Sequence, residues 1–468
     1  MYKKLFYIGF ACYFFMIVLS LLFYRERTIL ADSAFCLFYV LKKGGYSIEL
    51  FRFTDIFAQS FPLLASKLGL DINTIIKSYS VGFIVFFSSC YLFTGILLKK
   101  YDFALLILLI NILFITETFY YTPSQLPQGI CLLIVVFAAL IKYEKYINNP
   151  IYWILLFIVS ILFVFYHPLV LFALLYISGF FILHNLKTKS LIDRKSILFI
   201  LIAYFIIIVF KSTVLRSDYE THSLSGLKNF IKLFPDYFTI YSNKYFLENC
   251  IKKYYWIPII SIINIFTYYK HKKKNELLFF LVFLLGYLLL INISYPTYIT
   301  PKYYIENLYL PLGLIIALPL IVDVLPLINN RKITNVLFLF IMSTFCYRVY
   351  AAHNTYTNRL NWEKNFMYKN IGKKLIVNTK NVPLDTLIDT WGTPYEFWLL
   401  SGSEKLNTAS IVILDSPARL DWCRFSTNSI IVLWDCFPYK NFIGNKYFNF
   451  TDSVSKYNIV PVKGSKEN

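Results

Sequence analysis

Charged residues are scarce in this chain. They make up 15% of its 468 residues, whereas apolar residues make up 58%. A soluble protein of this size needs a polar surface that so few charges cannot supply, which excludes an ordinary water-soluble enzyme. Disorder is also excluded, because 46 phenylalanines and 39 tyrosines are the opposite of a disordered composition. The composition therefore predicts a multi-pass membrane protein.

Several motifs of established chemistry are missing as well. The eight cysteines include no Cys-x-x-Cys pair and no Cys/His spacing suited to a metal, so we predict no metal centre. The glycine-rich nucleotide loops, the Gly-x-Ser-x-Gly hydrolase motif and the His-Glu-x-x-His zinc motif are absent. The formal net charge of +20 would indicate nucleic acid in a soluble chain. In a membrane protein it reflects topology, so we expect no nucleic acid partner.

Eleven apolar runs approach the length of about 20 residues that a helix needs to cross a bilayer. They are residues 5–24, 75–98, 103–117, 126–142, 151–166, 168–184, 196–212, 254–269, 276–293, 305–325 and 333–350. Proline in His167-Pro168 separates the fifth run from the sixth, because it breaks the helix there. We therefore expect an all-α polytopic module over residues 1–352 with about 11 transmembrane helices.

Lysine and arginine are unevenly distributed among the connections. With the N-terminus in the cytoplasm, the inside connections contain 16 basic residues and five acidic ones. The short outside connections contain a single basic residue, Lys302. This asymmetry follows the positive-inside rule. It predicts that three longer segments lie outside: residues 25–74, 213–253 and the tail from 353.

The tail has a different composition from the rest of the chain, with 14 basic and 10 acidic residues. Turn clusters separate its short apolar runs at 374–378, 410–414 and 429–434, which predicts a small extracytoplasmic α/β domain over 353–468. Cys423 and Cys436 lie in this domain. In an oxidising compartment they either form a disulfide or remain free thiols, and the sequence leaves both alternatives open.

Two short amphipathic helices are predicted in segment 25–74. The first begins at Asp32-Ser33 and ends at Gly44-Gly45, after a basic last turn. The second begins at Thr54-Asp55 and ends near Gly69. Their apolar faces predict that both lie on the membrane surface, and segment 213–253 has a similar pattern.

Two carboxylates near the outer face are candidate catalytic residues. Asp32 follows the first span by about eight residues, where it could take a proton from an acceptor hydroxyl or simply cap a surface helix. Glu117 lies at the outer end of the third span, at a depth where an unpaired acid is costly. It is either functional or extends to the interface, and the sequence leaves both interpretations open.

A small set of basic residues also faces outward. Cations at the headgroup level suit a lipid phosphate, and arginine binds one through two hydrogen bonds. The set comprises Arg52, Lys211, Arg216 and Lys302. Each residue alone more commonly extends toward the lipid headgroups, so only the set favours a binding role. His167 either binds a ligand or ends a helix.

Together these features resemble the GT-C superfamily of membrane glycosyltransferases, which includes protein mannosyltransferases and aminoarabinose transferases. Members have a cytoplasmic N-terminus and a first outside loop of two amphipathic helices, with an Asp just after the first span. A second long outside loop follows the seventh span, and many members end in an extracytoplasmic domain. Here Asp32 in Leu30-Ala-Asp-Ser33, segment 213–253 and the tail after 353 match that order.

Shorter motifs extend the resemblance. Ser60-Phe-Pro-Leu63 falls where members often have a His- or Lys-Pro-Pro-Leu sequence. The stretch from Tyr295 to Lys302 is similar to the basic, tyrosine- and proline-containing stretch that enters a late span. Two departures stand out. The usual Asp-Glu pair is Asp32-Ser33, and the basic residue before the Pro-Pro is missing, which leaves Arg52 as its substitute.

The resemblance implies a polyprenyl-phosphate sugar as donor substrate, no cofactor, and inversion at the anomeric carbon. It implies Asp32 as the general base and Glu117 as a group that holds the acceptor or a cation. Three basic residues would offset the charge of the departing phosphate: Lys211, Arg216 and Lys302. Many relatives act without a metal, and none is predicted here.

The resemblance further implies a multi-pass protein of the bacterial inner (plasma) membrane whose acceptor is a glycan, a lipid or a protein. Tyr295, Tyr298 and Trp391 are available to stack on sugars, although most aromatic residues fill the spans and the interface belts. The contacts with membrane lipid and with the lipid-linked sugar would lie at the outer face.

Other functions remain as alternatives. A polysaccharide polymerase or ligase of cell-surface glycan assembly also uses lipid-linked glycans, but such proteins rarely have a separate C-terminal domain. A lipid or glycan transporter is less favoured, because the spans contain almost no ionisable residues and the chain has no internal repeats. A receptor or scaffold that lost an ancestral activity is the remaining alternative.

Overall fold

The computed structural model describes residues 1–185, 192–215, 225–297, 302–328, 330–420, 423, 428–450 and 455–461. Within these residues, seven helices are long and apolar enough to cross a membrane, and three shorter apolar helices accompany them. The chain is therefore an α-helical membrane protein with a small sheet region near its C-terminus. The seven helices do not establish the larger number of crossings expected from the sequence.

Each of the eleven apolar runs nevertheless forms helical structure. The long helices are α1 (Tyr2–Leu22), α5 (Ile72–Leu92), α7 (Gln125–Tyr143), α10 (Arg194–Val214), α15 (Lys274–Ser294), α17 (Leu310–Pro319) and α18 (Arg331–Tyr368). Wider π turns extend α5 to Leu97 and α17 to Val324, and a tighter 3-10 turn continues α17 to Leu327. The three shorter apolar helices are α6 (Tyr101–Leu113), α8 (Pro150–Val164) and α9 (Val170–Asn185), and the remaining run forms α14 (Trp256–Lys270).

The centre of the bundle is formed by α6 and α17. Every residue of α6 from Phe103 to Leu113 is buried, and so is every residue of α17. Helices that are apolar all round require neighbours on all sides, which the surrounding helices supply. The two helices also pack against each other. These two helices are therefore the core of the membrane module.

The C-terminal region contains two small sheets. β1 (Lys374–Asn378) pairs in parallel with both β2 (Ser410–Leu414) and β5 (Asn458–Val460), and β3 (Ser429–Ile431) pairs antiparallel with β4 (Cys436–Pro438). The strands expected at 374–378 and 410–414 are thus confirmed, while the third ends at Ile431 rather than 434. Helices α19 (Leu384–Leu387) and α20 (Thr393–Ser403) complete the domain, and Cys423 is bonded to Cys436.

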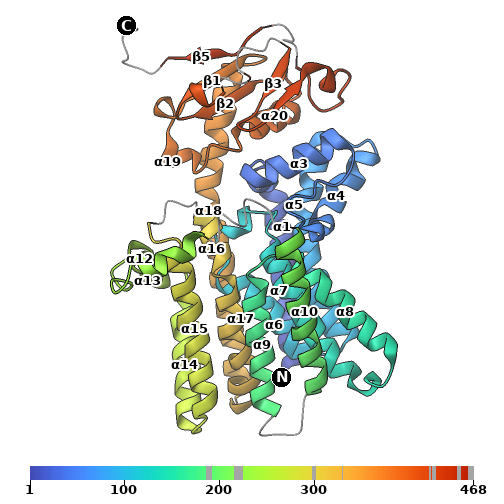
Figure 1. Cartoon of the computed structure of the whole chain (residues 1–468), viewed down its shortest axis with the longest axis vertical. Helices are drawn as coiled ribbons and strands as arrows, with labels where there is room; N and C mark the ends of the chain where they lie inside the picture. The colour runs from blue at the N-terminus through green and yellow to red at the C-terminus, as the bar shows by residue number, and fades with distance from the viewer. Residues whose placement is uncertain are drawn as a thin grey trace.

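Helix α18 joins the bundle to this C-terminal domain without a break. Its 38 residues span about 57 Å, roughly twice the thickness of a bilayer core. Residue 353 therefore lies inside the helix. One end of α18 packs against α1 and α6, and the other against α19 and α20. In Figure 1 it runs vertically from the lower end of the bundle into the domain.

The two helices expected in segment 25–74 form, and they differ in how far their apolar side chains are buried. α3 (Ala31–Lys43) ends at Gly44, whose φ of +62° is suited to glycine. The prediction that α3 lies on a membrane surface is wrong, because Phe38 is fully buried against Tyr395 and Trp398 of the C-terminal domain. Helix α4 (Ile56–Lys67) retains a row of exposed apolar side chains: Phe57, Phe61 and Leu64.

The described parts of the three long segments expected outside lie toward one end of the bundle. Helices α3 and α4, the pair α12 (Asn229–Lys232) and α13 (Tyr241–Lys252), and α16 (Lys302–Leu308) all lie between the bundle and the C-terminal domain in Figure 1. The N-terminus and the turn between α14 and α15 lie toward the opposite end. The segments that contain these short helices therefore lie together, between the bundle and the C-terminal domain.

Candidate functional site

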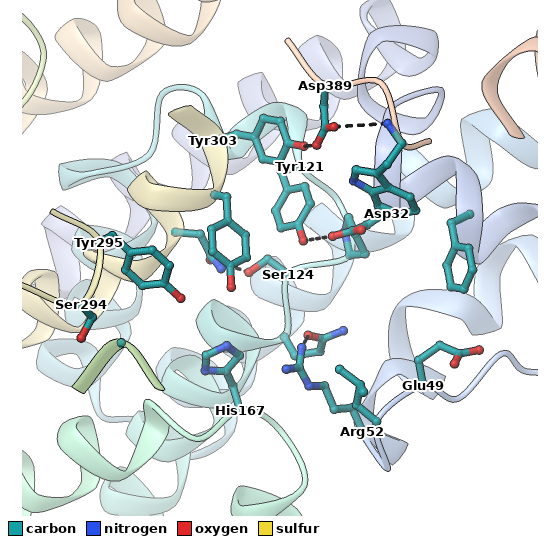
Figure 2. A pocket seen from close by; sticks show the side chains of 18 of the residues that line it. Asp32, Glu49, Arg52, Tyr121, Ser124, His167, Ser294, Tyr295, Tyr303 and Asp389 are labelled. Atoms are coloured by element: carbon teal, nitrogen blue, oxygen red, sulfur yellow. Dashed lines mark hydrogen bonds between the residues drawn. The ribbon is translucent and has the colours of Figure 1, made fainter. Parts of the chain in front are cut away.

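A cavity of about 1260 Å³ opens where the bundle meets the C-terminal domain. It is lined by α3, by the turns at 49–55, 121–125 and 294–297, by His167, and by α12 and α16. The C-terminal domain completes it with three residues: Asp389, Trp391 and Trp434. Figure 2 shows side chains from α3, the three turns, α16 and the C-terminal domain, together with His167, converging on one space.

Asp32 faces the cavity from the first turn of α3. The N-cap of this helix is Leu30, so the interpretation of Asp32 as the helix cap is wrong. Its carboxylate instead accepts a hydrogen bond from the hydroxyl of Tyr121 (Figure 2). Burial raises the pKa of Asp32 to about 6, against the opposing effect of the Tyr121 hydrogen bond. The residue is therefore an ionised but comparatively basic carboxylate at neutral pH.

Two further carboxylates line the cavity. Asp55 accepts hydrogen bonds at 2.8 Å from the amide of Gln125, and burial raises its pKa to about 7. Asp389 accepts from the backbone N–H groups of Thr390 at 2.7 Å and Trp391 at 3.3 Å, and burial raises its pKa as well. Neither carboxylate is among the predicted site residues, and the sequence predicts Asp55 only as the start of a helix.

Cationic side chains line another part of the same cavity: Arg52, Lys228 and Lys232. Arg52 donates to Gln125 at 3.0 Å, and Lys228 and Lys232 flank Asn229, which donates to the carbonyl of Ile293 at 3.2 Å. In Figure 2, Arg52 and His167 lie on the side of the cavity away from Asp389. Asp55 and Glu49 lie near Arg52, so cationic and acidic side chains alternate around the cavity.

His167 lies near Arg52 and Lys211. Burial lowers the pKa of His167 well below its usual value, and the two neighbouring cations lower it further. The ring is therefore neutral at pH 7, and its Nδ1 accepts from the backbone N–H of Leu169 at 3.2 Å. Lys211 is buried against the ring of Phe165 at 5.6 Å and is not among the cavity-lining residues.

The structure brings together some predicted site residues and not others. Asp32, Arg52 and His167 line one cavity, together with Tyr295 and Trp391. Glu117 does not line it and pairs instead with Lys253. Lys302 is exposed at the start of α16, away from the lining. Two predicted residues, Arg216 and Tyr298, lie outside the described residues.

Glu306 supports the turn that contains Tyr121. It is buried and accepts hydrogen bonds from the backbone N–H groups of Thr116 at 2.6 Å and Thr118 at 2.8 Å, and from the hydroxyl of Tyr254 at 2.8 Å. Glu117 accepts from the hydroxyl of Tyr356 at 3.1 Å on the same turn. In the sequence, the one feature that marks Glu306 is its position as an acidic residue at the start of an apolar run.

The C-terminal domain contacts the backbone beside Asp32. Glu396 accepts from the N–H of Ala31, whose φ of +38° is rarely adopted by residues with a side chain. Arg359 of α18 pairs with Glu396 and donates to the carbonyl of Ile29 at 2.9 Å. All three side chains of the cluster formed by Arg359, Glu363 and Glu396 are buried. The domain therefore fixes the start of α3, and with it the position of Asp32.

Sequence comparison matched no protein-family model and no curated protein, and comparison of the fold matched no solved structure. The function must therefore be argued from the cavity itself and from the residues that line it.

Proposed function

We propose that this chain is a membrane glycosyltransferase that moves a sugar from a polyprenyl-phosphate donor to an acceptor hydroxyl. The observation that supports it most strongly is a partly buried carboxylate, Asp32, in a large cavity that is also lined by cationic side chains. A group-transfer enzyme of this kind needs a base for the nucleophile and positive charge for the leaving phosphate.

In the proposed reaction, Asp32 accepts the proton of the acceptor hydroxyl as that oxygen forms a bond to the anomeric carbon. The bond between the anomeric carbon and the phosphate oxygen breaks, and its electron pair leaves with the polyprenyl phosphate. Attack from the face opposite the leaving group inverts the anomeric centre. A base with a pKa near 6 suits this role, because it is ionised at pH 7 and still basic enough to share a proton.

The cationic side chains of the cavity suit the phosphate. Arg52, Lys228 and Lys232 supply positive charge that offsets the negative charge developing as the phosphate departs. Because Nδ1 of neutral His167 accepts from Leu169, its proton is on Nε2, which can donate a hydrogen bond to the phosphate without a change of charge. The chain's own residues therefore supply both charge stabilisation and a proton acceptor within one cavity.

The proposed topology has eleven crossings, a cytoplasmic N-terminus and an extracytoplasmic C-terminal domain in a bacterial inner membrane. It is supported by the positive-inside distribution of basic residues and by the grouping of the three long segments toward one end of the bundle. The disulfide between Cys423 and Cys436 suits an oxidising compartment.

The test is a transfer assay with the full chain in lipid nanodiscs. The donors are polyprenyl-phosphate hexoses and pentoses with a labelled sugar, supplied with extracted cell-surface glycan as acceptor. We expect one donor to label the acceptor and Asp32→Asn to abolish labelling. The control is Asp385→Asn, an exposed carboxylate four residues from Asp389. Labelling by the Asp32→Asn protein at the wild-type rate would refute the proposed mechanism.

A further inference from the structure

Two tryptophans stand on the cavity wall that the C-terminal domain forms. The ring centroids of Trp391 and Trp434 lie 5.1 Å apart, and Phe35 of α3 lies 6.0 and 6.1 Å from them. Trp434 is 51% exposed, whereas the neighbouring Tyr395 is fully buried. Trp434 is therefore not required to fill the core, and its ring is open to a ligand in the cavity.

Carboxylates lie at the edge of this aromatic pair. Asp389 precedes Trp391 by two residues and accepts a hydrogen bond from its backbone N–H. The negative charge of Asp389 also contributes to the raised pKa of Asp32. A sugar ring has an apolar C–H face and a rim of hydroxyl donors. An indole plane bordered by carboxylate acceptors matches both features. The same carboxylates repel an anionic ligand.

The cavity has room for a ligand besides the donor. Its volume of about 1260 Å³ exceeds the range of about 300–1,000 Å³ typical of a pocket for one small molecule. A donor phosphate is attracted to Arg52, Lys228 and Lys232, none of which belongs to the wall that the C-terminal domain forms. The wall with Trp391 and Trp434 therefore remains for a second, uncharged molecule.

The tryptophans also lie next to the proposed base. A Cβ atom on Gly392 would lie only 2.5 Å from the Cα of Ala31, so the backbone beside Trp391 touches the backbone beside Asp32. This close approach requires glycine at 392. A ring stacked on Trp391 would thus have its hydroxyls near the Asp32 carboxylate.

We infer that Trp391 and Trp434 form the acceptor subsite and that the acceptor is a neutral glycan. One of its sugar rings stacks on the indoles while the attacked hydroxyl faces Asp32. This inference rests on the proposed transferase function and extends it by naming the class of acceptor. It also gives the C-terminal domain a direct role in recognising that acceptor.

The first test measures glycan binding without any donor. Saturation-transfer NMR on the full chain in nanodiscs uses trisaccharides of glucose, mannose and N-acetylglucosamine, with irradiation of aromatic protons. We expect transfer to at least one neutral trisaccharide, weakened about three- to tenfold in Trp434→Ala and largely retained in Trp434→Tyr. The control is Trp362→Phe, because Trp362 stacks on Phe366 in α18 and does not line the cavity.

The second test separates the acceptor from the donor. In the transfer assay, Trp434→Ala is expected to raise the KM for the acceptor about three- to tenfold and leave the KM for the donor unchanged. A rise in the donor KM instead would overturn the subsite assignment while leaving the transferase function intact.

The result of the binding test does not depend on transferase activity. If no donor supports transfer, the transferase proposal fails while the NMR result still decides the subsite. Two results would overturn the inference there: binding of no neutral trisaccharide, or equal binding by Trp434→Ala and the Trp362→Phe control. Equally tight binding of a trisaccharide that contains a uronic acid would overturn the assignment of a neutral acceptor.

Discussion

Asp32 ionises close to neutral pH because burial raises its pKa to about 6. If it is the base, kcat/KM should fall tenfold per pH unit below that value, since only the ionised carboxylate accepts a proton. Tyr121→Phe removes a hydrogen bond that stabilises the charged form. We expect this variant to shift the acid limb of the pH profile to higher pH.

The measurement is kcat/KM from pH 4.5 to 8 for the wild type and for Tyr121→Phe. Tyr46→Phe serves as the control, because Tyr46 is exposed and its hydroxyl contacts only Ser60 among the described residues. An acid limb that stays in place or moves to lower pH in Tyr121→Phe would contradict the assignment of Asp32 as the base.

Individual residues differ in how far the sequence could predict them. Asp32 was identifiable from its position after the first span, and Arg52 from its charge on the less basic side of the protein. Asp389 and Trp434 were not, because they reach the cavity only when the C-terminal domain folds onto α3. More than 350 residues separate these partners in sequence, and local patterns give no signal over that distance.

At the level of elements, the contact between α3 and the turn before α20 should be highly sensitive to volume. Gly392→Ala would place a methyl group 2.5 Å from the Cα of Ala31, and two backbones cannot separate easily. We expect a loss of about 1–3 kcal/mol in the free energy of unfolding and a large loss of transfer activity. Gly45→Ala is the control, because nothing lies within 4 Å of its added methyl group.

Thermal unfolding in nanodiscs, followed by tryptophan fluorescence, measures this prediction alongside the transfer assay. Equal midpoints and equal activity for Gly392→Ala and Gly45→Ala would show that the domain does not press on the start of α3 as the structure describes.

The end of α18 should depend on a single arginine. Arg359 pairs with Glu363 at 2.8 Å and with Glu396, and it donates to Leu387 at 3.0 Å. Arg359→Ala leaves two buried carboxylates without a counter-charge, which costs about 3–5 kcal/mol. The matched control is Arg331→Ala at the exposed start of the same helix.

Unfolding midpoints of both variants, measured by differential scanning fluorimetry, check this expectation. We expect a marked decrease for Arg359→Ala and little change for Arg331→Ala. Similar midpoints would mean that the buried cluster does not hold the C-terminal domain to the bundle.

The helices and strands themselves could be predicted from the sequence more readily than the contacts that they make. The strands at 374–378 and 410–414 and the glycine stop of α3 follow from local residue types. The continuity of α18 through residue 353 could not be predicted from local residue types. The amino-acid composition changes where the helix leaves its apolar neighbours, whereas the helix itself ends at Tyr368. The burial of α3 was also missed, since an apolar face predicts a partner without saying whether it is lipid or protein.

For the whole molecule, the proposed topology predicts which parts are accessible from each side of the membrane. Alkaline phosphatase fused after residue 461 should be active, because it would lie outside the cytoplasm. Green fluorescent protein inserted at 271–273, between α14 and α15, should fluoresce because it would lie inside. An inactive phosphatase fusion after 461 would contradict the eleven-span arrangement.

The most direct test of the account as a whole compares donor binding with turnover in Asp32→Asn. Asparagine preserves the shape of the side chain but cannot accept a proton, so the variant should bind the labelled polyprenyl-phosphate sugar with wild-type affinity. Its single-turnover transfer rate should fall at least about 100-fold, the lower range for loss of a general base. A rate within twofold of the wild type, with the same donor affinity, would contradict the role of Asp32 and the enzyme mechanism built on it.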